Sequence, residues 1–160
     1  MKAATVAQLK KELQHREPDE LLQLCLRLSR FKKENKELLT YLLFEADNEE
    51  GYIEMVKDET DRQFLEINPK SFFYVKKSVR KILRNLKKYI RYSGNKETEV
   101  TLLLHFCQKL RRFRPSIQQN TTLMNLYGRQ LIFIEKKIGA LHEDLQYDFG
   151  LILEELKKKK

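Results

Sequence analysis

The residues best suited to chemistry are basic and lie between positions 70 and 93. This segment holds nine lysines and arginines and no acidic residue. At 100° per residue the charges fall within an arc of about 140°, opposite an apolar arc of about 100°. Phe73, Tyr74 and Tyr92 lie on or beside the basic arc, where they could stack on bases or pack under the lysine side chains. Such a face could neutralise nucleic acid phosphates, through Lys77, Arg80, Lys81, Arg84, Lys88 and Arg91.

An acidic segment directly before this one supplies the competing interpretation. Residues 45–66 hold nine acidic residues against two basic ones, a net charge of −7. If the two segments form an antiparallel hairpin, the acidic side chains can flank the basic ones and cancel their electrostatic field at a distance. Exposed pairs of this kind contribute only about 0–1 kcal/mol each. The sequence therefore leaves open whether the basic face is exposed or covered.

The residues that usually carry catalysis or bind metal are scattered. His15, His105 and His142 lie in three separate predicted segments, without the spacing of a metal-binding helix motif. Cys25 and Cys107 fall on apolar helix faces, which predicts inert core residues. The sequence has no glycine-rich phosphate loop, nucleophile elbow or kinase signature. We therefore expect no enzymatic activity, no catalytic residue, no metal and no cofactor.

The overall charge favours a polyanionic partner but does not select one. The chain has 32 basic and 23 acidic residues, a formal charge of +9, which suits nucleic acid, acidic protein or anionic lipid. The two cysteines form no C-x-x-C pattern, and the N-terminus is amphipathic without an apolar signal core. Apolar runs such as 38–44 are too short to cross a bilayer. We expect a cytoplasmic protein without a transmembrane segment.

The composition predicts that helices position these residues. The 160 residues include five glycines and three prolines, and 26 leucines against five valines, which favours helix over strand. We expect an all-α, single-domain array of six or seven antiparallel helices built as helical hairpins, covering 1–156, with a flexible Lys tail over 157–160. Caps and breakers predict the first six helices at about 5–15, 18–31, 35–46, 52–67, 69–93 and 97–113. The signals are a capping box at Thr5 and Gln8, Pro18 in a first turn, a cap at Asn35, the Asn68–Pro69 boundary and Gly94 as a helix end.

A long helix is predicted at the C-terminus. From Ile117 onward, apolar residues recur every seven positions, from Met124 to Ile152, a stripe that could pair with a second copy in a homodimer. A single helix over 117–156 would be about 60 Å long, which exceeds a compact domain of this size. It either bends or breaks into two helices, and Gly128 and Gly139 are weak points. The other stripe residues are Tyr127, Leu131, Ile134, Ile138, Leu141 and Leu145.

Two segments 82 residues apart resemble each other. Residues 21–31 and 103–113 share six identities in eleven positions, which indicates either an internal duplication or a coincidence between two leucine-rich helices. Taken together, these patterns predict a non-catalytic macromolecular interaction or scaffold protein that presents a helical surface, with a protein partner favoured over nucleic acid. The alternative is a nucleic-acid-binding protein that uses the basic face of the helix spanning about 69–93.

Overall fold

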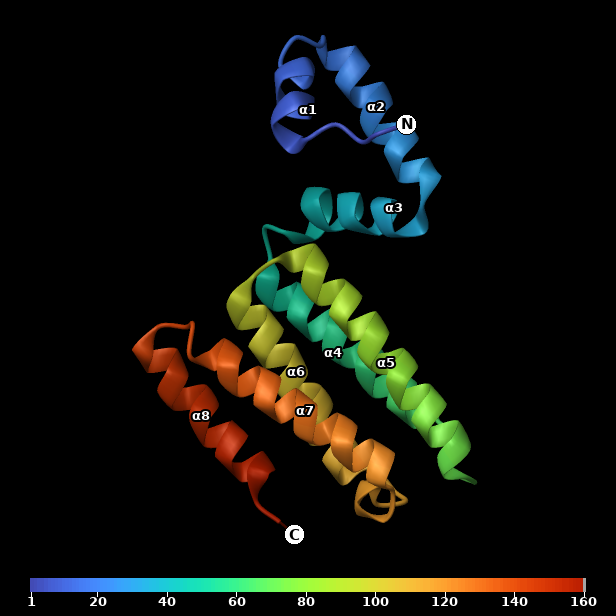
Figure 1. The fold of residues 1–160 in the computed structure, drawn as a ribbon, viewed down its shortest axis with the longest axis vertical. Helices are drawn as coiled ribbons and strands as arrows, with labels where there is room; N and C mark the ends of the chain where they lie inside the picture. The colour runs from blue at the N-terminus through green and yellow to red at the C-terminus, as the bar shows by residue number, and fades with distance from the viewer. Residues whose placement is uncertain (160) are drawn as a thin grey trace. The chain divides into compact units, whose positions relative to one another are not determined.

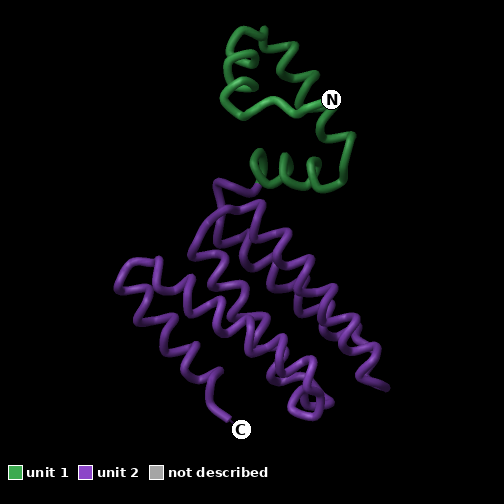
Figure 2. The backbone as a smooth tube through the Cα atoms, in the orientation of Figure 1, with its two compact units in different colours: residues 1–44 green, residues 45–160 purple. Residues whose placement is uncertain are grey.

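The computed structural model describes residues 1–159 and confirms the all-α class. The described residues form eight α-helices and no strand, so the predicted count of six or seven is slightly too low. Internal contacts divide the chain into two compact units, Met1–Phe44 and Glu45–Lys160 (Figure 2), here called unit 1 and unit 2. The single domain predicted over 1–156 is not tested by this division and stays a prediction. Within residues 1–159, no helix has both the length and the apolar character needed to span a membrane.

Unit 1 consists of α1 (Val6–Leu13), α2 (Pro18–Phe31) and α3 (Lys33–Thr40), and a π-helical turn begins at its end (Tyr41–Glu45). The predicted signals at the first two helix starts are confirmed. Thr5 and Gln8 form a capping box on α1, and Pro18 occupies the start of α2, where its missing N–H costs nothing.

The start of the third helix is not where the sequence predicted it. α3 begins at Lys33, directly after the extended residue Lys32, rather than behind a cap at Asn35. The Asn35 side-chain amide instead donates to the Leu28 carbonyl, at 2.8 Å. Asn35 therefore satisfies a carbonyl in the last turn of α2, a group that has no partner within its own helix.

Unit 2 consists of α4 (Glu49–Leu65), α5 (Phe72–Ser93), α6 (Lys96–Arg112), α7 (Thr121–Ile138) and α8 (Glu143–Lys157) (Figure 1). Helix α6 is central and packs against the other four. Its residues Val100, Leu102, Phe106 and Leu110 are fully buried. Short loops and cross-helix contacts make α4, α5 and α6 an antiparallel series, because the start of α4 lies beside the end of α5.

Polar contacts fix that arrangement. The Glu49 carboxylate accepts hydrogen bonds from the hydroxyls of Ser93 and Thr98, and it thereby joins the start of α4 to α5 and α6. The Tyr52 hydroxyl donates to the Tyr89 carbonyl at 2.7 Å. Buried polar groups paired in this way add to the apolar packing and fix the register of the helices.

The ends of α5 show one correction and one confirmation. The helix begins at Phe72 rather than Pro69, because the Asn68 side chain accepts the Lys70 N–H at 3.0 Å and forms a turn before the helix. At the other end Gly94 has a φ of 65°. This left-handed conformation ends the helix as predicted, and glycine adopts it without a steric penalty.

The C-terminal region forms two helices instead of one long helix. α7 ends before Gly139 and α8 begins at Glu143, so the 117–156 helix and its continuous heptad stripe do not exist. The stripe residues Tyr127, Leu131 and Ile134 are buried within unit 2. α8 folds back on α7, and the Tyr127 hydroxyl donates to the Leu156 carbonyl at 2.7 Å.

The predicted Lys tail begins inside the last helix. Lys157 is the final residue of α8, and its ammonium group lies 2.8 Å from the Glu135 carboxylate. Lys158 pairs with Glu155 at 2.8 Å. The flexibility predicted for 157–160 stays a prediction, and Lys160 lies outside the described residues.

Candidate polyanion interface

Helix α5 is amphipathic along its whole length, as the sequence predicted. Val75, Val79, Ile82, Leu86 and Ile90 are buried on one side. The opposite side carries the six predicted contact residues, here called the α5 ridge. Five of them are exposed and the sixth, Lys88, is half-buried; the exposed residues are Lys77, Arg80, Lys81, Arg84 and Arg91.

The ridge is long enough to meet several phosphates. Lys77 and Arg91 are fourteen positions apart, which corresponds to about 21 Å along an α-helix. Apart from the adjacent pair Arg80 and Lys81, successive ridge residues are three or four positions apart, so they lie on one face of the helix. Lys88 also places its ammonium group 5.4 Å from the centre of the Tyr89 ring.

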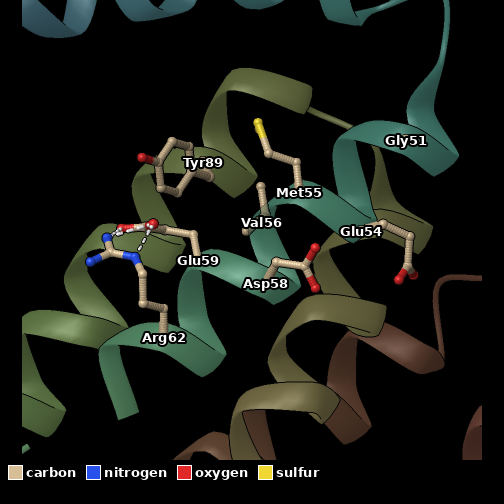
Figure 3. A pocket seen from close by; sticks show the side chains of 8 residues that line it. All are labelled: Gly51, Glu54, Met55, Val56, Asp58, Glu59, Arg62 and Tyr89. Atoms are coloured by element: carbon tan, nitrogen blue, oxygen red, sulfur yellow. Dashed lines mark hydrogen bonds and ion pairs between the residues drawn. The ribbon is translucent and has the colours of Figure 1, made fainter. Parts of the chain in front are cut away.

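The acidic helix α4 pairs mainly with its own cations. Arg62 bonds the Glu59 carboxylate at 2.6 Å (Figure 3). It also bonds the Glu66 carboxylate at 2.7 Å, and Lys57 pairs with Glu54 at 3.2 Å. The hydrogen bond from Arg62 lowers the pKa of Glu59. These contacts lie within α4 and the residue that follows it, so they involve no cation of α5.

Another α4 carboxylate faces α6. Asp61 lies 2.6 Å from the His105 ring and 3.2 Å from the Lys109 ammonium group. Within residues 1–159, none of the five exposed ridge residues forms an ion pair. The hairpin considered from the sequence does form. In the part of the chain that the structure describes, its acidic residues form no ion pair with the five exposed ridge residues, although Glu59 and Glu66 line a hollow together with Lys81.

Two aromatic residues accompany the ridge and a third does not. Phe73 is 68% exposed and Tyr74 is 49% exposed. Tyr92, which the sequence placed beside the same arc, is buried. Only the first two can meet a ligand.

Arg111, in the last turn of α6, has a structural role. Arg111 donates to the Glu155 carbonyl and, at 2.9 Å, to the Lys158 carbonyl. These carbonyls belong to the last turn of α8 and the residue after it. A cation at this position also opposes the negative end of the helix dipole. The packing of α8 against α6 therefore accounts for Arg111 without a ligand.

A hollow of about 570 Å³ is lined by α4 and by Tyr89 of α5 (Figure 3). Glu59 in its wall is bound to Arg62, and Met55 and Tyr89 supply apolar surface. The residues that the structure describes contain no group of three histidine, cysteine, aspartate or glutamate side chains placed to hold a metal.

Sequence reasoning missed a second surface, on unit 1. We define the unit 1 apolar surface as its exposed large hydrophobic side chains on α1–α3 and the turn that follows. Cys25, predicted to be a core residue, is exposed as well. Within unit 1 only Ser29 and Tyr41 are buried. The surface consists of Val6, Leu9, Leu13, Leu22, Leu24, Leu28, Phe31, Leu38, Leu42, Leu43 and Phe44.

The signal for this surface was present in α2. Its apolar residues cover an arc of about 220° at 100° per residue, whereas a core-facing stripe needs little more than 100°. One packing partner cannot cover such an arc. Between α1 and α2 the surface forms a cleft of about 700 Å³, which is lined by Leu9, Leu13 and Leu24 and has charged residues at its edge.

Comparison with known proteins finds no similarity to this chain. No family model matches it, and no curated protein or solved structure matches it either.

Proposed function

We propose that this chain is a non-catalytic macromolecular interaction protein. The observation that carries the proposal is the unit 1 apolar surface. Leu28 is 61% exposed and Phe31 is 77% exposed, although both lie on regular helices. Three other members of the surface, Leu9, Leu13 and Leu24, line one cleft, and exposed apolar patches usually mark binding sites.

A protein is the partner that suits this surface. Apolar helix faces bind other helices by packing side-chain ridges into grooves, and the cleft between α1 and α2 is lined by both leucines and charged residues. Nucleic acid would leave these leucines in contact with phosphate and water.

Affinity capture with matched variants tests the proposal. Leu28→Glu with Phe31→Glu alters the unit 1 apolar surface, and Leu65→Glu with Ile132→Glu alters residues that are 87% and 70% exposed in unit 2. We expect the wild-type chain and the unit 2 variant to recover the same protein, and the unit 1 variant to lose it. Equal recovery by all three chains, or no recovered protein, would contradict the proposal.

A second candidate function is nucleic acid binding through the α5 ridge. The observation that favours it is the row of five exposed cations without an ion pair. Six phosphate contacts predict a plot of log K against log salt with a slope of about −5 for duplex and about −4 for single strands. Titration of labelled DNA and RNA over a salt series measures this slope. A flat response, or no binding at low salt, removes the candidate.

The heptad stripe predicted a homodimer. Burial of the central stripe residues within unit 2 weakens this hypothesis. Light scattering at several concentrations tests it, and a constant monomer mass would exclude it. We also propose a cytoplasmic location, which is supported by the two cysteines without a C-x-x-C pattern.

A further inference from the structure

Phe73 is unusual because it is a large aromatic residue in the middle of the cationic arc. At 100° per residue it points in the same direction as Arg91, between the directions of Arg80 and Arg84. The buried stripe of α5 lies on the opposite side of the helix. With 68% of its surface exposed, Phe73 has no role in the core that would account for its presence.

The surroundings of Phe73 combine an aromatic pair with positive charge. Its ring centroid is 5.5 Å from that of Tyr74, and the ring planes meet at 78°, an edge-to-face geometry that stabilises aromatic pairs. Lys77 and Arg80 follow Phe73 by four and seven positions and therefore lie on the same face. An aromatic pair thus lies at one end of a row of cations, five of which are exposed and form no ion pair within residues 1–159.

We propose that the α5 ridge binds single-stranded nucleic acid, with bases stacked on Phe73 and Tyr74 and the backbone along the cations. This inference rests on the nucleic acid candidate of the proposed function. A single strand offers unstacked base faces beside its phosphates, whereas the bases of a duplex are already stacked on each other. The combination of exposed aromatic rings and a cationic row therefore suits a single strand better than a duplex.

The two kinds of contact contribute differently to affinity. The cations give a salt-dependent contribution that a duplex can also obtain. Stacking on one aromatic ring contributes a factor of about 5 to 160 in affinity, depends little on salt, and is available to an unpaired base. Loss of the ring should therefore weaken single-strand binding without changing its salt dependence.

Fluorescence anisotropy of the full chain tests the proposal. The probes are labelled oligouridine and oligothymidine of about twelve nucleotides and duplexes of equal length, each titrated over a salt series. The test variant is Phe73→Leu, which keeps an apolar side chain but removes the ring. The matched control is Tyr147→Leu, since Tyr147 is an aromatic residue of α8 with 69% exposure. Both positions are exposed, so neither substitution disturbs the core.

We expect the wild-type chain to bind single strands more tightly than duplexes. Phe73→Leu should weaken single-strand binding at least about fivefold, leave the duplex affinity unchanged and keep the salt slope. Tyr147→Leu should change none of these. Arg84→Gln should weaken binding to both probes and reduce the steepness of the single-strand slope by about 0.7.

Three outcomes would overturn the proposal in different ways. Unchanged single-strand affinity in Phe73→Leu, with a steep salt slope retained, rejects stacking and leaves the nucleic acid candidate intact. Tighter binding to the duplex rejects the single strand as the ligand. No binding to any probe at low salt, or binding of polyglutamate that nucleic acid does not displace, rejects both this inference and the candidate on which it rests.

Discussion

Helices α2 and α6 have closely similar apolar patterns but opposite environments. Leu28 in α2 is 61% exposed, whereas Leu110, its equivalent in α6, is fully buried. Cys25 is exposed and the equivalent Cys107 is buried. The internal duplication that could explain the likeness stays a prediction.

The neighbours of each helix account for the difference. α6 packs against four helices of unit 2, and α2 packs mainly against α3. An amphipathic pattern therefore specifies which face of a helix can be buried, but the number of surrounding helices decides whether burial occurs. In unit 1 too few helices are present to cover the apolar arc of α2, and we propose that a partner protein covers it.

The largest expected effect comes from shortening the two equivalent leucines. Leu110→Ala should lower the free energy of unfolding by about 2–5 kcal/mol, because it leaves a cavity in a packed core. Leu28→Ala should change it by no more than about 0.5 kcal/mol, since the side chain is already in contact with water. Denaturant unfolding of both full-length variants measures the difference. Similar losses would show that α2 is buried in solution and would contradict the comparison.

Alkaline pH should destabilise unit 2 through two buried groups that can lose a proton, the Cys107 thiol and the Tyr127 hydroxyl. Burial raises the pKa of the Cys107 thiol from 9.0 to about 12 and that of Tyr127 from 10.0 to about 12. Between the ordinary pKa and the raised pKa of each group, the unfolded chain loses a proton that the folded chain keeps. The stability present below pH 9 is therefore lost as the pH rises. Each proton contributes at most about 1.4 kcal/mol per pH unit.

Unfolding of two cysteine variants over this pH range isolates the contribution of the thiol. Cys107→Ala should make stability fall less steeply above pH 9, and Cys25→Ala should leave the slope as in the wild type, because Cys25 is exposed. An unchanged slope in Cys107→Ala would mean that the thiol does not titrate differently on unfolding.

The helix caps provide a smaller test of the same comparison. Asn95 accepts the N–H groups of Glu97 and Thr98 at the start of α6, so Asn95→Ala should cost unit 2 about 0.5–2 kcal/mol. Thr5→Ala removes the cap of α1 and should lower the helix content without moving the unfolding midpoint of unit 2. Circular dichroism during denaturation separates the two results. An equal shift of that midpoint would show that α1 is coupled to the core.

Local signals made much of the fold predictable from the sequence. The Thr5 and Asn95 caps, Pro18 and Gly94 each fix one helix end through backbone groups close in the chain. The two faces of α5 follow from a strong 3.6-residue period, so the ridge residues could be named in advance.

Features that depend on distant residues could not be predicted in this way. The return of α8 onto α7 involves a hydrogen bond from the Tyr127 hydroxyl to the Leu156 carbonyl, across 29 residues. On α4, Asp61 pairs with His105 and Lys109 of α6 rather than with the ridge. Neither contact follows from periodicity, because each joins elements that are far apart in the chain.

Hydrogen exchange of the full chain, followed by mass spectrometry, tests most directly whether unit 1 lacks a core of its own. Amides of α6 should exchange only on global unfolding of unit 2, and amides of α2 should exchange at least about a hundredfold faster through local opening. Equal protection of α2 and α6 in the isolated chain would show that unit 1 is fully stabilised without a partner, and would contradict this account.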